Sequence, residues 1–457
     1  MRRFNFRLRK YTEADPGQAR IDPNSEDVLM IKAKSGLQRR NFLALMAASA
    51  AAGALPARRA HAEQVAELWH YLGAGGELDG VNAMMAEIDK SLGGRVAHRV
   101  VPGGAAGVRQ QVQVSLMGGV PPLAYQISAG VELSQLAKSG RFEPLDDIWS
   151  EIDGDATFPA GLLQVVSSGS SRYGIPFSMS MLGNVWYNKA VFEKLGLSVP
   201  TNWDEWLAVC EAIKAAGISP LTSASGPAWT TYQFYGPLLD AAGEDGFWEF
   251  AEGRMSLTDP RLAAALDLFA KNFVPYFDPN WTGAKWADGL DALMRGDVAM
   301  YCMGDWASGY MKQRGWTPDV EYGFFQSPGI SGYAIFQSDV AVIVKGDKSD
   351  LGKEFAKALS GPEAQGAFAK NKGSLAPNKN VDPSIYDVIG QKEYEIMVSS
   401  TVLPNLYTLL PPGLKEDFGS AIEKFGATRD RAGLDAELTR LEPQREQRLA
   451  AGEFGTY

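Results

Sequence analysis

The sequence predicts an α/β fold built on a doubly wound parallel sheet, and three observations favour this class. Strand-like and helix-like segments alternate over residues 65–127 in the order β-α-β-α-β. The first helical segment carries apolar residues at steps of three and four, as an amphipathic helix requires. Gly93 closes that segment, at a position where helices commonly end. Since parallel strands need crossover helices, the alternation favours a parallel sheet.

The first unit can be followed element by element. Its first helix places Leu78, Val81, Met85, Ile88 and Leu92 on one face, which we expect to cover the sheet. The expected elements are a strand at 65–72, a helix at 77–94, a strand at 95–102, a helix at 105–119 and a strand at 121–127.

A second unit begins near residue 174. Within it, a capping-box pattern from Thr201 starts a helix over 201–218, and we assign Trp203 of its apolar stripe to the core. The further expected elements are helices at 259–273 and 286–297, strands at 298–303 and 333–346, two helices over 349–373, and a polar helical tail from Lys415.

Residues 30–62 have the layout of a signal peptide. Arg39 and Arg40 precede an uncharged, alanine-rich run over 41–57, which is shorter than the roughly 20 residues of a spanning helix. The sequence AHA at 60–62 then matches the small-residue motif at which signal peptides are cleaved. The arginine pair resembles the twin-arginine type, whose cargo crosses the membrane folded. We therefore expect export to the periplasm.

Residues 1–29 add nothing that a signal peptide needs. The stretch MIKAKSGLQRR from Met30 is an ordinary basic region, so we expect translation to start at Met30. Residues 1–29 are then a disordered extension or a mis-assigned start. Cleavage after Ala62 leaves no cysteine at the new N-terminus for a lipid anchor, so we expect the mature protein to be free in the periplasm.

The expected mature chain is acidic. Residues 1–62 contain 12 of the 44 Lys and Arg residues and 5 of the 54 Asp and Glu residues, so the remainder has a formal charge of −17. Such a surface repels phosphate backbones, and no basic stretch with interleaved aromatic residues occurs. We therefore exclude nucleic acid as a partner.

Cysteine and histidine are too scarce for several common active sites. Cys210 falls in a predicted amphipathic helix and Cys302 in an apolar strand, so we expect two separate buried thiols. Beyond residue 62, histidine occurs only at His70 and His98, which leaves no zinc-ligand set and almost no candidate for a Ser-His-Asp triad. We predict neither a metal nor a catalytic residue.

The loop LGAGGE at 72–77 invites comparison with dinucleotide-binding loops. That pattern requires a third glycine where Leu78 stands, and no acidic residue ends the next strand, at 98–102. We therefore predict no nucleotide cofactor. No motif marks a pair of catalytic carboxylates, although the many acidic residues do not exclude one. A periplasmic hydrolase or oxidoreductase acting on carbohydrate is thus the alternative reading.

Aromatic residues recur beside amides and carboxylates in the predicted loops. A sugar needs this mixture, because its C–H face stacks on an aromatic ring while its hydroxyl rim needs hydrogen-bond partners. Gln126 and Ser128 also stand at the carboxyl end of a strand, where ligands of open α/β sheets bind. The candidate ligand-binding residues are Tyr71, Glu77, Gln126, Ser128, Trp229, Trp286, Asp305, Trp306 and Asn405.

Several segments resemble family 1 extracellular solute-binding proteins. Residues 172–218 resemble the segment in which their chain first crosses between lobes. LMRGDVAMYCMGDW at 293–306 is similar to their G-x-x-A-M…G-x-W element, and SGPEAQGAFAKNKGSLAPNKN at 360–380 to their late helix-turn. With GGE at 75–77 and GGVPPLAYQISAG at 118–130, the sequence most resembles the glucose/mannose-type branch.

This resemblance implies a two-lobe fold of the type II periplasmic binding proteins, with a ligand cleft between the lobes. Two crossing strands, near 176–182 and 336–342, would absorb the hinge rotation. The implied lobes are an N-lobe of 63–178 and 339–378 and a C-lobe of 179–338 and 379–457.

The resemblance also implies a function: the lobes close on a solute, which is then delivered unchanged to the permease subunits of an ABC transporter in the inner membrane. Leu72 stands where the branch has a second ring, and Ser128 where it has Lys or His, which favours a sugar other than glucose or a polyol. The contacts implied by position are Tyr71, Glu77, Trp229, Trp286 and Asp305.

We therefore predict a monomeric periplasmic protein that binds a mono- or small oligosaccharide or a polyol. A phosphorylated ligand would need a cluster of Lys or Arg in the cleft loops, and only Lys285 and Lys379 are candidates.

Overall fold

We describe a computed structural model of the 457-residue chain, which defines residues 66–73 and 76–457. The predicted extension at 1–29 and the predicted signal peptide at 30–62 lie outside the described residues. Within the described part, no helix combines the length and the apolar character needed to cross a membrane.

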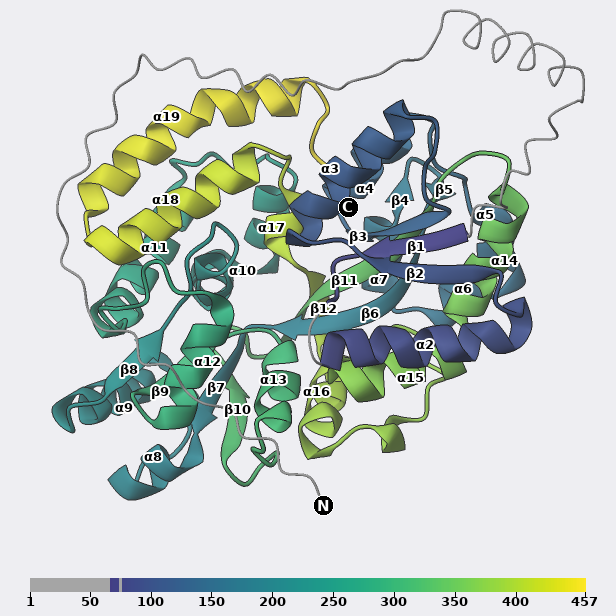
Figure 1. The fold of residues 1–457 in the computed structure, drawn as a ribbon. Coiled ribbons are helices and arrows are strands. Elements are labelled where there is room, and N and C mark those ends of the chain that lie inside the picture. The colour runs from purple at the N-terminus through teal and green to yellow at the C-terminus, as the bar shows by residue number, and fades with distance from the viewer. Residues whose placement is uncertain (1–65, 74–75) are drawn as a thin grey trace, which may run out of the picture. The chain divides into compact units, whose positions relative to one another are not determined.

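A mixed sheet, called the first sheet below, runs in the order β12-β11-β3-β1-β2, with β6 paired to β11 (Figure 1). β1 is parallel to both β2 and β3, as the β-α-β-α-β pattern predicts. β11 is antiparallel to β3 and β6, so the sheet is not wholly parallel. Its described strands are β1 (Ala66–His70), β2 (Val96–Val100), β3 (Ala124–Ser128), β6 (Gly174–Leu182), β11 (Tyr333–Ile343) and β12 (Thr401–Pro404).

Helices from two separate parts of the chain, residues 76–165 and 349–372, pack around the first sheet. α2 contacts both α14 and α15, and α3 contacts β1 and β3. The helices of this region are α2 (Gly76–Leu92), α3 (Gly104–Met117), α4 (Val131–Ala137), α5 (Asp146–Glu151), α6 (Gly154–Thr157), α7 (Ala160–Val165), α14 (Ser349–Ser360) and α15 (Pro362–Lys372), with a small hairpin of β4 (Ser167–Ser168) and β5 (Ser171–Arg172).

A second sheet has the order β10-β7-β9-β8. Its described strands are β7 (Asn184–Asn188), β8 (Ser219–Thr222), β9 (Val298–Cys302) and β10 (Tyr322–Gln326). The helices of this stretch are α8 (Lys189–Leu195), α9 (Trp203–Ala215), η1 (Thr230–Gln233), α10 (Tyr235–Ala251), α11 (Pro260–Asn272), η2 (Val274–Tyr276), α12 (Trp286–Arg295) and α13 (Trp306–Gln313).

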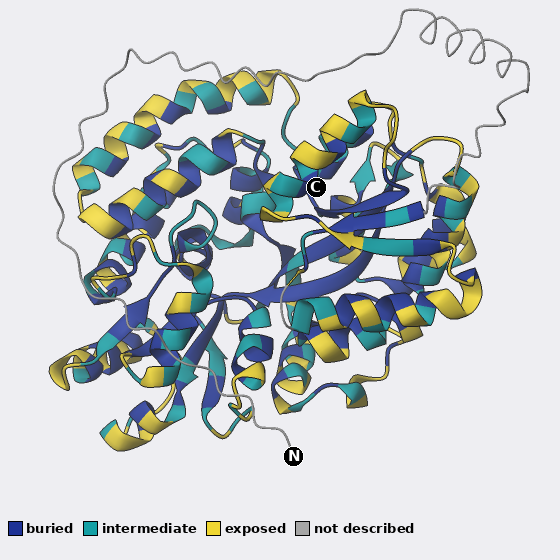
Figure 2. Ribbon diagram, viewed as in Figure 1, coloured by how far each residue is buried: buried dark blue, intermediate teal, exposed yellow. Residues whose placement is uncertain are grey.

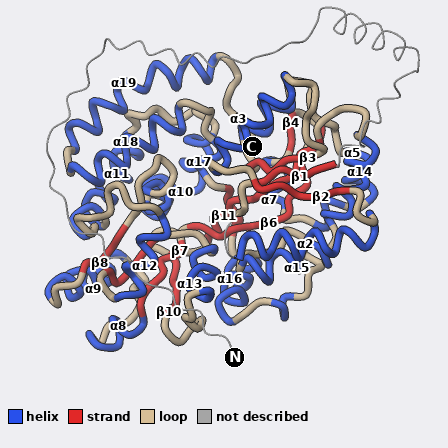
Figure 3. Tube along the Cα trace, viewed as in Figure 1, coloured by secondary structure: helices blue, strands red, loops and turns tan. Residues whose placement is uncertain are grey.

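β6 and β11 carry the chain between the two sheets. Gly183 alone separates β6 from β7, at φ +80°, and a Cβ there would lie 2.6 Å from the Ile330 side chain. The chain returns to the first sheet from β10 through residues 327–332 into β11. β6 and β11 pair antiparallel, so they form a two-stranded ribbon leading from one sheet to the other (Figure 3). These are the crossing strands that the sequence predicts.

The chain ends in helices. The predicted polar tail from Lys415 is α18 and α19, and α18 packs against both η1 and α19. The division of the chain into two lobes at the stated residues stays a prediction. The remaining elements are η3 (Pro383–Ile385), α16 (Val388–Ser399), α17 (Leu406–Leu409), α18 (Leu414–Thr428) and α19 (Arg431–Ala450).

Helix α9 shows where the local pattern misplaced the core. Its N-cap is Asn202, whose side chain accepts a hydrogen bond from the Glu205 backbone N–H at 3.0 Å. The helix is therefore capped one residue later than predicted, and the Glu205 carboxylate accepts from the Thr201 backbone N–H and hydroxyl. Trp206 is fully buried, whereas Trp203, which we assigned to the core, is only partly buried in the first turn.

Strands β6, β9 and β11 are almost entirely buried, whereas β2, β10 and β12 are partly exposed (Figure 2). Cys210 of α9 and Cys302 of β9 are both buried and free, which confirms the prediction of two separate thiols. Burial raises the pKa of each thiol, so both stay protonated at neutral pH and act as small apolar groups.

Candidate functional site

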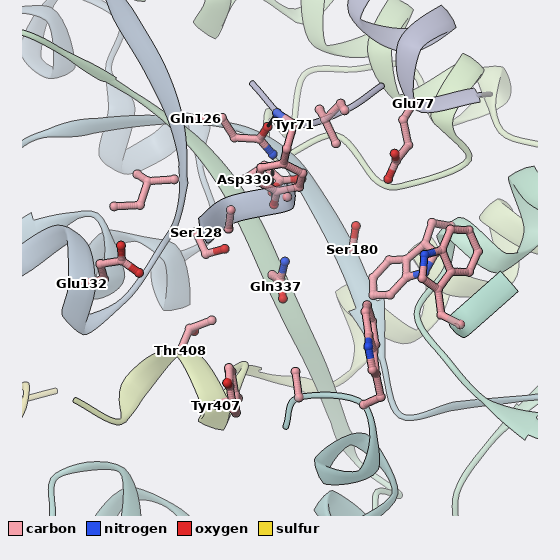
Figure 4. Close-up of a pocket in the computed structure, with 18 of the residues that line it drawn as sticks. Tyr71, Glu77, Gln126, Ser128, Glu132, Ser180, Gln337, Asp339, Tyr407 and Thr408 are labelled. Atoms are coloured by element: carbon pink, nitrogen blue, oxygen red, sulfur yellow. Dashed lines mark hydrogen bonds between the residues drawn. The ribbon is translucent and has the colours of Figure 1, made fainter. Parts of the chain in front are cut away.

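A cavity of about 490 Å³ lies at the carboxyl ends of β1 and β3 (Figure 4). Ligand sites for small molecules typically measure ~300–1,000 Å³. Elements associated with both sheets contribute side chains to it. Seven of the nine candidate residues are among its described lining residues: Tyr71, Glu77, Gln126, Ser128, Trp229, Trp286 and Trp306.

One wall of the cavity is polar and centres on Asp339 of β11. The hydroxyl of Tyr71 donates to Asp339 Oδ1 at 2.9 Å, and Gln126 Nε2 donates to the same oxygen at 2.8 Å. The Gln126 Oε1 accepts from the Tyr71 backbone N–H at 3.2 Å, which fixes the orientation of that amide. Burial and the neighbouring Asp339 carboxylate raise the pKa of Tyr71, so its hydroxyl remains a donor. The wall is thus pre-ordered without a ligand.

Lys372, the last residue of α15, reaches the same network. Its Nζ donates to Ser178 Oγ at 2.8 Å and to Ser180 Oγ at 3.0 Å, and lies 3.3 Å from Asp339 Oδ2. One buried ammonium therefore contacts both crossing strands, β6 through the serines and β11 through the carboxylate. The sequence does not mark this role, because Lys372 looks like an ordinary basic residue at a helix C-terminus.

Glu77 stands in the first turn of α2, where the helix dipole favours a carboxylate. The N-terminus of α2 lies against the end of α15: a Cβ on Gly76 would be 2.7 Å from the Asn371 carbonyl oxygen. Burial raises the pKa of Glu77 to about 7, opposed by the positive charge of Lys372. Figure 4 shows its carboxylate directed into the cavity.

Aromatic side chains from the second sheet's helices form another part of the lining. Trp229 precedes η1, and Trp286 and Trp306 are the first residues of α12 and α13. The Trp229 and Trp306 rings meet edge-to-face at 6.2 Å, and Tyr232, which the sequence did not single out, lies 5.8 Å from Trp229. Trp286 packs against Tyr310 at 5.2 Å. These contacts hold the rings in place before any ligand binds.

Asp305 and Asn405 were predicted to bind ligand, but neither lines the cavity. Asp305 is buried and its Oδ2 accepts from the Met181 backbone N–H at 2.9 Å, which ties the loop after β9 to the crossing strand β6. Asn405 Nδ2 donates to Gln337 Oε1 at 2.9 Å, and Asn405 Oδ1 accepts from the Tyr407 N–H at 3.0 Å. Gln337 and Tyr407 do line the cavity, so Asn405 positions lining residues.

A further set of lining residues, called the charged end below, escaped the sequence analysis. Arg109 Nη1 donates to Glu132 Oε2 at 2.8 Å, and Lys415 Nζ lies 3.5 Å from that same oxygen. No shared motif marks these residues, because they come from four separate helices that only the tertiary structure brings together. The charged end consists of Arg109, Glu132, Tyr407, Thr408, Lys415 and Glu416.

The cations of the cavity differ from those the sequence suggested. Lys285 and Lys379 are not among its described lining residues. Arg109, Lys372 and Lys415 line it instead, and each of these three is ion-paired with a carboxylate of the cavity. The charges therefore balance one another within the protein, which disfavours a phosphorylated ligand.

The two histidines pair with each other. His70 Nε2 and His98 Nδ1 are 3.0 Å apart, and burial lowers the pKa of His70 to about 4, which keeps it neutral. Among the described residues, no group of three or more His, Cys, Asp or Glu side chains is arranged to hold a metal ion.

The chain matches the family model of the bacterial extracellular solute-binding proteins over residues 94–366. It is 30% identical over 379 residues to an uncharacterized ABC transporter extracellular-binding protein of Pyrococcus horikoshii, across 80% of this chain and 85% of that protein. It is 27% identical to a probable sugar-binding periplasmic protein of Brucella suis, across 75% of this chain and 81% of that one.

Among solved structures, the bacterial solute receptor AcbH, described as having an exclusive preference for β-D-galactopyranose, is similar in fold. Its TM-score is 0.75 at 19% identity, covering 84% of this chain and 99% of AcbH. The α/β two-lobe fold is therefore that of solute-binding proteins. These receptors bind without chemistry, which removes the enzymatic alternative. The chain belongs to the bacterial extracellular solute-binding proteins, the family that serves as receptors for ABC transporters.

Proposed function

We propose that this protein is the periplasmic receptor of a sugar ABC transporter. It captures a mono- or small oligosaccharide or a polyol in the cavity and delivers it, chemically unchanged, to the membrane permease. The observation that supports this proposal best is the joint lining of the cavity: Trp229, Trp286 and Trp306 together with the polar wall around Asp339.

Each part of this lining suits one part of a sugar. Indole faces stack on the apolar C–H face of a pyranose, which removes apolar surface of both partners from water. Glu77, Gln126 and Ser128 offer acceptors and donors to the hydroxyl rim. Since the lining cations are already paired with carboxylates, the arrangement favours a neutral ligand.

Closure of a hinge provides the transport signal in this proposal. A ligand that contacts residues from both sheets binds a closed form better than an open one, and shifts the equilibrium by that difference in affinity. β6, β11 and the single-residue connection at Gly183 are the segments placed to absorb the rotation. A permease can then distinguish the closed, loaded receptor from the open one.

The identity of the sugar is a finer proposal. Tyr71 is followed by the buried Leu72, so no second ring is present beside it, and Ser128 supplies a hydroxyl where the glucose-binding branch has Lys or His. We therefore place the preferred ligand outside glucose, among other sugars and polyols. AcbH is described as preferring galactopyranose, which makes galactose a natural first ligand to test.

A thermal-shift screen of the purified protein against monosaccharides, disaccharides and polyols tests the proposal. A true ligand raises the midpoint because it stabilises the native state by RT ln(1 + [L]/Kd). Trp286→Ala should lower the affinity for that ligand by about tenfold or more, through loss of a stacking face, while the ligand-free midpoint stays close to wild type. No shift with any carbohydrate, or consumption of the sugar on incubation, would contradict the proposal.

A further inference from the structure

We propose that the charged end of the cavity is a second saccharide subsite, so that the preferred ligand contains at least two sugar rings. This inference rests on the proposed function and goes beyond it by assigning a task to residues that the first sugar ring does not require. The two regions are built from different parts of the chain. The polar wall comes from the loop after β1 and from β3, β6, β11 and α15, whereas the charged end comes from α3, α4, α17 and α18.

The two regions are spatially separate within one cavity. Figure 4 shows Glu132, Tyr407 and Thr408 grouped on the side away from Glu77. Gln337 of β11 is drawn between the two groups, so the cavity has two ends with a polar floor between them. A single ring held at the Glu77 end would leave the charged end filled only with water.

The volume of the cavity supports more than one ring. At the ~30 Å³ that a water molecule takes up in the liquid, about 490 Å³ corresponds to roughly 16 water-sized groups. That is more than one pyranose ring with its hydroxyls fills. Two linked rings use the space without enlarging the cavity.

The ion pairs at the charged end leave hydrogen-bonding capacity for a ligand. Among the described contacts, both Arg109 and Lys415 approach Oε2 of Glu132, and neither approaches its Oε1. Only one of the five N–H donors of Arg109 is used in these contacts. A carboxylate oxygen and several guanidinium donors, held in place by the pairing, are therefore able to bind vicinal hydroxyls of a sugar.

Tyr407 adds an apolar surface to these polar groups. It lines the cavity and is partly exposed, and the Lys415 ammonium lies 5.6 Å from its ring centroid. Asn405 fixes the backbone at Tyr407 by accepting its N–H. The charged end thus combines an aromatic ring with polar and charged groups, as the rest of the cavity lining does with its tryptophans and the polar wall. We infer a second stacking position.

Calorimetric titration of the full-length protein with matched ligands tests this inference. The probes are D-glucose and D-galactose against maltose, cellobiose, lactose and melibiose, which are built from those same hexoses. We expect one of the disaccharides to bind at least about tenfold more tightly than either constituent hexose, since ~1.4 kcal/mol of added contact gives that factor.

Variants at the charged end identify where the gain arises. Tyr407→Ala and Glu132→Gln should each bring the ratio of disaccharide to hexose affinity close to one, whereas Tyr407→Phe, which keeps the ring, should retain it. Trp286→Ala serves as the control outside the charged end, because it should weaken hexose and disaccharide together and leave the ratio unchanged. Ligand-free thermal midpoints near wild type establish that the variants fold.

The outcomes separate this inference from the proposed function. Hexose binding with no tighter disaccharide, or a ratio unaffected by both Tyr407→Ala and Glu132→Gln, would overturn the second subsite and leave the sugar receptor intact. A protein that binds none of the six probes nor any sugar in the thermal screen would overturn both.

Discussion

Lys372 Nζ lies 3.3 Å from Asp339 Oδ2, and the two side chains are only 3% and 5% exposed. This buried ion pair joins the end of α15 to the crossing strand β11. Through Ser178 and Ser180 the same ammonium also holds β6. One charged group therefore contacts the polar wall of the cavity and both strands of the ribbon between the sheets.

Removing one partner of this pair should strongly destabilise the protein. Lys372→Met leaves the Asp339 carboxylate buried without a counter-charge, which typically costs ~3–5 kcal/mol. The double variant Lys372→Met/Asp339→Asn should lose less unfolding free energy than the two single variants lose in sum. Urea unfolding of the ligand-free protein measures these differences.

An exposed ion pair provides the matched control. Lys353 and Asp147 are 2.6 Å apart but 29% and 57% exposed, so Lys353→Met should cost no more than ~1 kcal/mol. If Lys353→Met and Lys372→Met lowered the free energy of unfolding equally, burial would not explain the contribution of the Lys372 ion pair to stability.

Glu77 should make the ligand-free protein sensitive to pH. Burial raises its pKa from the ordinary 4.5 to about 7, so the folded state holds this proton more tightly than the unfolded state. Its contribution to stability is fully present below pH 4.5 and is lost as pH rises through about 7. We therefore expect Glu77→Gln to be more stable than wild type at pH 8, with the difference shrinking towards pH 4.5 in unfolding curves.

Ligand affinity should depend on the same group in the opposite sense. The ionised Glu77 accepts hydrogen bonds from sugar hydroxyls more strongly than the neutral acid. Affinity in wild type should therefore rise between about pH 5 and pH 8, while Glu77→Gln binds more weakly and shows little dependence. Titration calorimetry across this range checks the prediction, and identical pH profiles for the two proteins would exclude Glu77 as a contact.

Replacement by alanine should destabilise the protein much more at Trp206 than at Trp203, although both residues belong to α9. Trp206 is fully buried and its Nε1 donates to the Asn272 carbonyl at 2.7 Å, so Trp206→Ala should cost ~3–5 kcal/mol. Trp203 is partly exposed at the helix N-terminus, and Trp203→Ala should cost clearly less. Chemical denaturation of both variants makes the comparison, and a reversed order would mean that the helix is rotated from the position described.

Asp305 and Glu393 are two further buried carboxyl groups whose ionisation should make stability depend on pH. Burial raises the pKa of both groups, and the negative charge of Asp305 raises the pKa of Glu393 further. Glu393 Oε1 accepts from Asn184 Nδ2 at 2.6 Å, a contact that a neutral amide can keep. Raised folded-state pKa values mean that stability falls as pH rises above the ordinary carboxyl range, near pH 4.

We therefore expect Glu393→Gln to be more stable than wild type at pH 8 and to approach it at pH 5. Thermal unfolding at both pH values, with Glu395→Gln on the exposed face of the same helix as control, checks this. Parallel curves for wild type and Glu393→Gln would rule out a charged carboxyl at this position.

Much of the fold could be read from local patterns, because periodic burial of one face is encoded within a dozen residues. The helix at 77–94 was predicted for that reason, and α2 confirms it. The strand predicted at 333–346 is confirmed by β11, which is buried on both faces. The same reasoning failed at Trp203, which is only partly buried, whereas Trp206 in the same helix is fully buried. Tryptophans three residues apart lie near the same helix face, so periodicity does not tell which one packs into the core.

By itself, the sequence determined the alternating elements, the family and the candidate tryptophans near turns, since each depends on residues close together in the chain. Only the tertiary structure decided that Asp339 and Lys372 complete the wall begun by Tyr71 and Gln126, and that Asp305 and Asn405 stand behind the cavity. These contacts join residues as many as 268 positions apart in the sequence. They arise from packing of sheets and helices, and no local pattern carries that information.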